Sequence, residues 1–171
     1  LRLHDLAHGR DSRAVDPDQA RKGISAETTF DDDYSDYGVL EDRLAPLCEK
    51  VARQARAGGV AGRVVTLKLK TADFRILTRR RALPAATQTA RTLFSVGREL
   101  LKKEADGRRY RLIGIGLAEL SPLESLEADF FGNDESRALA EEKTADSIRA
   151  RFGPQAITSA RALRSRRPVQ D

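Results

Sequence analysis

Two consecutive basic segments carry the side chains best suited to bind a charged ligand, Arg63 to Thr71 and Asp73 to Leu83. In the first, the apolar residues Val65, Leu67 and Leu69 alternate with lysines and hydroxyl residues. That period of two is typical of a strand with one buried face. The other face would present lysine and threonine, which donate hydrogen bonds to phosphate oxygens. The segment therefore predicts a surface for the backbone of a nucleic acid.

Two other groupings resemble metal sites, and their residue types argue against both. The acidic run that begins at Asp31 has the spacing of a calcium-binding loop, but Asp36 stands where that loop needs glycine. A solvated loop before a helix explains these acids better, because acidic side chains favour helix N-termini. His4 and His8 are four residues apart, yet no third ligand lies near them in the sequence. No metal site is expected.

Charge is strongly segregated along the 171 residues, whose formal net charge is +5. Between residues 61 and 111, 14 Lys or Arg stand against 4 Asp or Glu. Between residues 119 and 146, 9 acids stand against 2 bases. This pattern favours a polyanionic partner for the middle of the chain and a different role for its end.

Targeting signals and cysteine usage suggest a cytoplasmic protein. No apolar run approaches the roughly 18 residues of a membrane span, and the first ten residues are not typical of a signal peptide. The single cysteine, Cys48, excludes an internal disulfide, and its place on an apolar stripe predicts an inert core residue. Because the chain begins at Leu1 rather than Met, we expect a fragment of a longer protein. We also expect a monomer with no membrane partner.

Hydrophobic periodicity predicts the order strand, helix, strand, strand, helix, strand. The expected elements are a strand at 22–30, a helix at 39–57, the two basic strands joined by a turn near Ala72-Asp73, a helix that starts after Pro84 with Thr87 as its N-cap, and a strand at 110–120. Pro46 must either kink the first helix or lie in its first turn. The order predicts an α+β fold, a two-layer sandwich in which a four-stranded sheet has two helices on one face. The opposite face is left open.

Two features of that open face stay undecided at this point. Gly114 and Gly116 share one face of the last strand, where they either weaken the strand or let a ligand backbone approach closely. In the third strand, Phe74 and Ile76 lie on one face, while Leu77 falls on the face that also carries arginines. A bulge or an overhanging strand end would resolve that conflict.

Several short stretches form a recognisable series along the chain. They are Lys22–Phe30 (KGISAETTF), Val64–Lys70 (VVTLKLK), Asp73-Phe74, Thr78-Arg79, Thr87 and Tyr110–Ile115 (YRLIGI). In this order they resemble the little-finger domain of Y-family translesion DNA polymerases. The resemblance covers residues 1–120 and implies three regions. These are the end of a thumb domain with its linker at 1–21, the little finger at 22–120, and a C-terminal extension at 121–171 made of an acidic segment, a short helix and a basic tail.

The resemblance implies an accessory role in DNA binding. In that family the sheet lies along the major groove near the primer-template junction and grips the backbones of both strands, which helps the enzyme hold damaged templates. Carried onto this chain, the DNA contacts would come from Lys22, Ser25, Thr29, Lys68, Lys70, Thr71, Arg75, Thr78, Arg79 and Arg81. No catalytic residue is carried over, because the carboxylates that hold two Mg²⁺ ions lie in the family's palm domain. The fragment is expected to bind DNA, to need no cofactor of its own and to catalyse nothing alone.

Members of the family also carry a short peptide after the little finger that binds the sliding clamp. Glu127, Ala128, Asp129, Phe130 and Phe131 occupy the corresponding place here. The family's peptide has a Gln followed by aliphatic residues and a Phe, so this stretch departs from it at its first two positions. The alternative is that the two phenylalanines pack back on the domain rather than dock in a pocket of a partner.

Two other classes of function compete with this interpretation. A single-stranded RNA-binding module of the RNA-recognition type has the same order of strands and helices, but it stacks bases on aromatic residues of its two central strands. Here the first strand offers only Phe30 and the third only Phe74. A protein-interaction module, whose main contact is with the clamp, is the third hypothesis.

Overall fold

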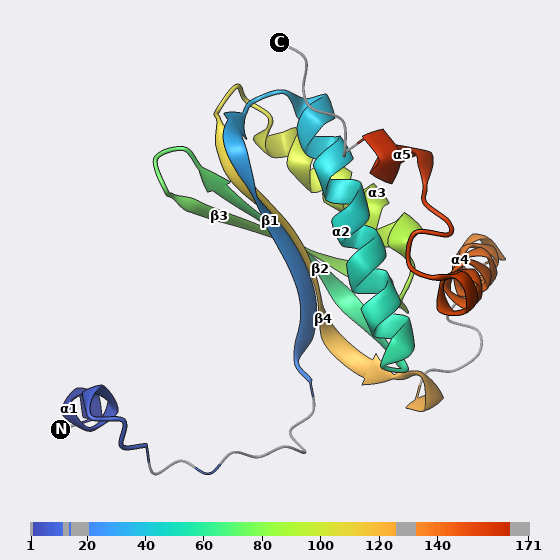
Figure 1. Cartoon of the computed structure of the whole chain (residues 1–171), viewed down its shortest axis with the longest axis horizontal. Helices are drawn as coiled ribbons and strands as arrows, with labels where there is room; N and C mark the ends of the chain where they lie inside the picture. Colours follow the sequence, from blue (N-terminus) through green and yellow to red (C-terminus); the bar gives the residue numbers. More distant parts are fainter. Residues whose placement is uncertain (1, 12–13, 15–20, 126–132, 165–171) are drawn as a thin grey trace.

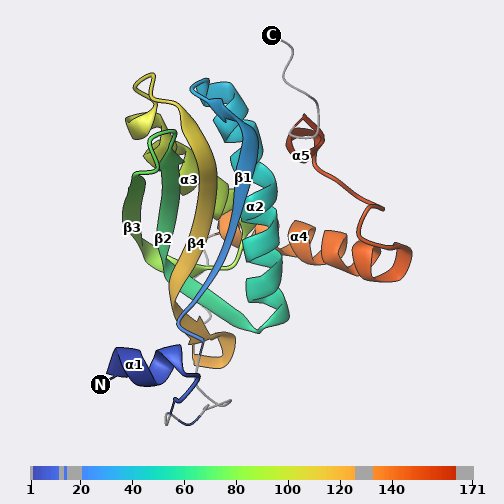
Figure 2. The ribbon, with the colours of Figure 1, turned by 60° about the vertical axis from the view of Figure 1, so that its left-hand side comes forward.

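The computed structural model describes residues 2–11, 14, 21–125 and 133–164. Its elements are α1 (Arg2–Ala7), β1 (Gly23–Tyr34), α2 (Tyr37–Ala57), β2 (Val60–Thr71), β3 (Ile76–Thr87), α3 (Ala90–Glu104), β4 (Tyr110–Pro122), η1 (Leu123–Ser125), α4 (Asn133–Phe152) and α5 (Ala160–Arg164). The strands form one antiparallel sheet in the order β1-β4-β2-β3. Helices α2 and α3 cover one face, and no described element covers the other (Figure 1 and Figure 2). The predicted two-layer α+β fold is confirmed.

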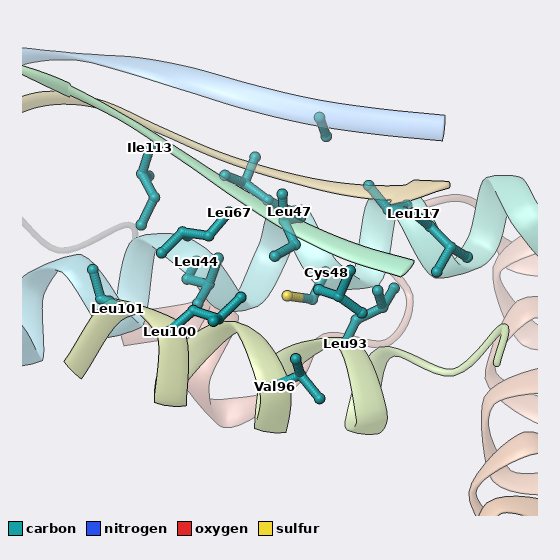
Figure 3. Close-up of a cluster of buried hydrophobic side chains, with 14 of the residues drawn as sticks. Leu44, Leu47, Cys48, Leu67, Leu93, Val96, Leu100, Leu101, Ile113 and Leu117 are labelled. Carbon is teal, nitrogen blue, oxygen red and sulfur yellow. The ribbon is translucent and has the colours of Figure 1, made fainter. Parts of the chain in front are cut away.

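The hydrophobic core lies between the sheet and the two helices α2 and α3 (Figure 3). Alternate residues of β2 and β4 point into it, because successive side chains of a strand point to opposite faces. Leu44, Leu67 and Ile115 are at most 1% exposed, and burying each such side chain stabilises the fold by about 1.5–3 kcal/mol. Gly97 lets α3 approach closely, since a Cβ there would lie 3.1 Å from side-chain carbons of Leu44 and Ile115. Cys48 is fully buried, and this burial raises the pKa of its thiol, as expected of an inert core residue.

The first long helix begins and continues as its sequence allows. Asp36 caps α2 by accepting a hydrogen bond from the backbone N–H of Val39 at 2.8 Å. Pro46 lies well inside α2 rather than in its first turn, so the second of the two predicted possibilities is excluded. Without an N–H, Pro46 leaves one carbonyl of the preceding turn without its helical partner.

The predicted start of the second helix is wrong. Strand β3 continues through Pro84 to Thr87, and α3 follows with Thr89 as its N-cap, whose hydroxyl accepts a hydrogen bond from the N–H of Thr92 at 3.3 Å. Proline is tolerated here because β3 is an edge strand, in which part of the backbone N–H groups have no partner strand. Thr87 is buried and bonds to the Thr89 hydroxyl and to Glu135 instead of capping the helix.

The C-terminal helices lie outside the α2–α3 layer (Figure 2). Helix α4 begins at Asn133 and contacts α3, while α5 contacts α2. In the described ranges, no helix has both the length and the apolar character needed to cross a membrane.

Candidate nucleic-acid interface

Three cross-strand rows make up the surface that we call the open face. From β1 to β3 they read Ser25–Gly116–Thr66–Arg80, Glu27–Gly114–Lys68–Thr78 and Thr29–Leu112–Lys70–Ile76. The residues between them along each strand, such as Leu67 and Ile115, belong to the core, so the register separates a polar face from an apolar one. The predicted alternation in β1, β2 and β4 is confirmed.

A hollow of about 400 Å³ runs along the open face over β4. Gly114 and Gly116 line it together with β1 residues on one side and with Thr66 and Lys68 of β2 on the other. The two glycines have different reasons to be glycine. A Cβ on Gly114 would lie 2.9 Å from the Cβ of Glu27, so the sheet itself requires glycine there. A Cβ on Gly116 would meet nothing nearer than 3.4 Å, so its effect is to keep the hollow deep.

An ion pair spans the middle row above Gly114. The Lys68 ammonium lies 2.8 Å from the Glu27 carboxylate, and both side chains are about half exposed. Exposed pairs of this kind contribute roughly 0–1 kcal/mol, so the pair opens at little cost. The Glu27 carboxylate therefore holds the Lys68 ammonium beside the hollow, and both side chains line it.

The expectation that Arg79 and Arg81 project from the open face is wrong. They pair with Leu67 and Val65, whose side chains are in the core, so both arginines lie on the helix-covered side of the edge strand. There they form ion pairs with two glutamates of α3, Arg79 with Glu104 and Arg81 with Glu99. Leu77 lies on the same side as these two arginines, opposite Leu69 of β2. The apolar Leu77 and the arginines thus share the helix-covered side, and no β-bulge separates them.

Sequence reasoning missed Arg80 on the open face. It is exposed, pairs with Thr66 across the strands, and has no ion-pair partner among the residues that the structure describes. The signal that could have found it is parity, because Arg80 lies two residues from Thr78, which faces Lys68. Which of the two alternate sets of β3 residues faces outward depends on the length of the preceding turn. That turn is longer than the sequence indicates, because β2 ends at Thr71 and β3 begins at Ile76.

The β2–β3 turn explains two further predicted contacts. Thr71 is 4% exposed, and its hydroxyl bonds to the Asp73 carboxylate and accepts from the Arg75 N–H at 3.1 Å. The expectation that Thr71 projects from the open face is therefore wrong, since it closes the turn. Its hydroxyl also lowers the pKa of the Asp73 carboxyl, which forms an exposed ion pair with Arg75 at 2.9 Å. Arg75 lies at the tip of the hairpin rather than over the sheet.

The remaining predicted DNA contacts lie on the open face or next to it. Ser25, Thr29 and Thr78 are exposed on that face, and Lys70 is half-buried beside them. Lys22 is exposed immediately before β1. The clamp-binding prediction at Glu127, Ala128, Asp129, Phe130 and Phe131 falls outside the described residues.

Aromatic side chains are missing from the centre of the open face. The central strands are β4 and β2, of which β2 contains no aromatic residue and β4 contains only Tyr110. Tyr110 is fully buried and donates its hydroxyl proton to the Glu104 carbonyl at 2.7 Å. The stacking platform of an RNA-recognition module therefore has no counterpart here.

The described residues offer no metal-binding cluster. Among residues 2–11, 14, 21–125 and 133–164, no group of three or more His, Cys, Asp or Glu side chains is placed to hold an ion. His4 and His8 instead contact each other, with Nδ1 of His8 2.9 Å from the His4 carbonyl oxygen. The described residues thus offer no group that fits the Mg²⁺ site of a polymerase palm.

Comparison with known sequences gives consistent relatives. The chain matches the impB/mucB/samB family C-terminal domain over residues 21–130. It is 60% identical to DNA polymerase IV of Caulobacter vibrioides, over 97% of this chain and 41% of that protein. It is 45% identical to DNA polymerase IV of Brucella melitensis, over 91% of this chain and 35% of that protein. The chain thus spans about two fifths or less of the length of these curated relatives.

Solved structures agree on the fold. A little-finger domain of DNA polymerase IV, solved in complex with the beta-clamp processivity factor, matches with a TM-score of 0.51 at 19% identity, over 65% of this chain and 98% of that one. A Y-family DNA polymerase chimera matches with a TM-score of 0.50 at 20% identity, over 71% of this chain and 35% of that one. At these identities the likeness concerns the fold alone.

Proposed function

Because this chain belongs to the impB/mucB/samB C-terminal domain family, as the little-finger domain of a Y-family DNA polymerase, we propose that its open face binds the backbones of primer-template DNA without sequence preference. One observation carries the proposal. A glycine-lined hollow is flanked by hydroxyl groups on β1 and by cations on β2 and β3. A phosphate backbone fits such a surface, because the hollow admits it closely and the flanking groups donate hydrogen bonds.

The wider role that we propose is accessory to damage bypass in the bacterial cytoplasm. The chain would act as a monomer that holds damaged templates, while Mg²⁺-dependent nucleotidyl transfer belongs to a palm domain. Residues 1–21 would be the end of a thumb domain and its linker, 22–120 the DNA-binding domain, and 121–171 a C-terminal extension. Within that extension, Glu127 to Phe131 would bind a sliding clamp, the kind of partner with which one matched little-finger domain forms a complex.

The face assignment can be tested by removing three positive charges from the open face. We expect the variant Lys68→Gln, Lys70→Gln, Arg80→Gln to bind duplex DNA more weakly at low salt. The slope of log K against log salt concentration should become less steep by about 3, because each phosphate contact contributes roughly 0.9. The measurement is a fluorescence anisotropy titration at several salt concentrations.

The matched control removes three exposed cations from α3, on the opposite side of the domain. Arg98→Gln, Lys102→Gln, Lys103→Gln changes the net charge equally but should leave the salt slope almost unchanged. Equal losses in both variants would mean that net charge, rather than the open face, governs binding. Unchanged binding in the first variant would refute the proposed function.

The alternative of a single-stranded RNA-binding module predicts a different preference. Titration of the same protein with single-stranded RNA and with primer-template DNA of equal length separates the two. We expect DNA to bind more tightly, since the central strands lack the aromatic pair that stacks RNA bases.

A further inference from the structure

Phe74 occupies a position in the β2–β3 turn where glycine would be the unstrained choice. Its backbone is left-handed, with φ of 67°, a conformation that bulky residues rarely adopt. Two hydrogen bonds impose it, from the Phe74 N–H to the Thr71 carbonyl at 2.9 Å and from the Thr71 N–H to the Arg75 carbonyl at 2.9 Å. This arrangement resembles hairpin loops in which a turn is followed by a left-handed residue, usually glycine. Strained residues of this kind concentrate at functional sites.

The strained residue presents a large aromatic ring to solvent. Phe74 is 61% exposed and is not part of the hydrophobic core cluster, so packing does not account for it. Ile76, the next strand residue on the open face, is 59% exposed. Together they make an apolar tip on an otherwise polar surface.

Two cations lie against the Phe74 ring. The guanidinium carbon of Arg111 is 4.1 Å from the ring centroid, and the ammonium nitrogen of Lys70 is 4.8 Å from it. Cation–π attraction holds such groups near the ring. An aromatic ring surrounded by cations has the composition of sites that bind single-stranded nucleic acid, where a base stacks on the ring and its phosphate meets the charge.

The position of the ring connects it to the open face. Lys70 belongs to the outermost row of that face, opposite Ile76. The β2–β3 hairpin projects away from α2 and α3 at this end of the sheet (Figure 1). A DNA strand whose phosphates follow the open face would leave the hollow at this end of the sheet. It would meet the Phe74 ring there.

We propose that Phe74, with Lys70 and Arg111, is a stacking site for one unpaired base of the DNA strand bound on the open face. The ligand is an unpaired rather than a paired base, because duplex stacking covers the faces of paired bases. The inference rests on the proposed function, since the open face must first hold the strand. It adds a preference for DNA in which single-stranded template adjoins the duplex.

The test compares two DNA molecules that contain the same duplex, one blunt and one with a single-stranded 5′ extension. We expect the unchanged chain to bind the extended DNA more tightly. Phe74→Gly should lose that preference, a loss on the order of tenfold in affinity for the extended DNA, and should keep its affinity for the blunt duplex. Glycine adopts the left-handed conformation readily, so the variant should fold with an unchanged or higher melting temperature. Phe74→Trp should retain the preference.

A fluorescent adenine analogue at the first unpaired position gives a direct readout. Its emission should be quenched on binding the unchanged chain and not on binding Phe74→Gly. If Phe74→Gly distinguishes the two DNAs as well as the unchanged chain does, the stacking site is wrong while the open face stands. If Phe74→Gly unfolds or loses blunt-duplex binding, the residue is structural and the inference is overturned. If the unchanged chain binds neither DNA, the proposed function fails first.

Discussion

Under the proposed function, Gly116 would control how closely a phosphate backbone can approach the sheet. Its Cα forms part of the hollow over β4, between Ser25 on one neighbouring strand and Thr66 on the other. A Cβ at this position would touch those side chains only at 3.4 Å and 3.9 Å, which is ordinary van der Waals contact. Position 116 can therefore accept a Cβ without disturbing the sheet, unlike position 114.

Gly116→Val should separate DNA affinity from stability. Valine suits a central strand, so the melting temperature should stay unchanged or rise. The added side chain would partly fill the hollow, and we expect duplex affinity to fall by about tenfold, equivalent to 1.4 kcal/mol. Anisotropy titration and thermal unfolding of the same sample measure both quantities. Gly116→Ala is the graded control, and a valine variant that binds DNA as tightly as glycine would show that the backbone does not enter the hollow.

How far individual residues can be assigned from the sequence depends on what fixes their register. The faces of Lys68 and Lys70 are predictable because apolar residues alternate with them along β2. The face of Arg79 is not, because it depends on the length of the preceding turn, which hydrogen bonds of Thr71 determine. Residues 78–81 contain no apolar side chain that alternates with the charged ones. The sequence pattern therefore cannot reveal how long the preceding turn is.

At the scale of elements, α4 is attached mainly by carboxylates rather than by an apolar stripe. Glu142 accepts hydrogen bonds from the backbone N–H groups of Ala90 at 2.8 Å and Arg91 at 3.2 Å, at the start of α3. It also forms an ion pair with Arg56 of α2, which pairs in addition with Asp146 at 2.7 Å. The first N–H groups of a helix have no partner within it, so Glu142 satisfies donors of α3 and interacts with its positive end.

Glu142→Gln should therefore loosen α4 and the first turn of α3 together. The loss of charge at the helix end and beside Arg56 should cost about 1–2 kcal/mol. Amide hydrogen exchange should accelerate at residues 133–152 and at the N-terminus of α3, with chemical denaturation giving the free energy. The matched control is Glu141→Gln, because Glu141 forms only exposed pairs with Arg91 and Arg137 and should change stability little. Equal effects of the two substitutions would contradict this account of the attachment.

Apolar periodicity decides which elements can be predicted from the sequence. The core strands and helices follow apolar periodicities, so β1, α2, β2 and β4 are recognisable with their order. The end of β3 is not, because Pro84 suggests a helix start, although an edge strand accommodates proline. The docking of α4 leaves little periodic signal, since its polar contacts are made largely by Glu135, Glu142 and Asp146.

At the scale of the whole molecule, the open face and helix α4 lie on different sides of the domain. The open face is turned toward the viewer in Figure 2, with α3 behind the sheet and with α2 and then α4 to the right of β1. The proposed clamp-binding stretch lies shortly before Asn133, the first residue of α4. The cations of the open face and the acids of α4 are thus separated in space as they are in sequence.

Simultaneous binding of DNA and clamp is the prediction that follows from this separation. The chain should be retained on an immobilised bacterial sliding clamp equally well with and without saturating primer-template DNA. The variant Phe130→Ala, Phe131→Ala should lose at least tenfold in clamp affinity, because buried aromatic anchors typically contribute about 2 kcal/mol or more each. This variant should bind DNA with unchanged affinity. The Lys68→Gln, Lys70→Gln, Arg80→Gln variant should instead bind DNA more weakly and bind the clamp with unchanged affinity. Release of the chain from the clamp by DNA would mean that the two partners compete for one surface.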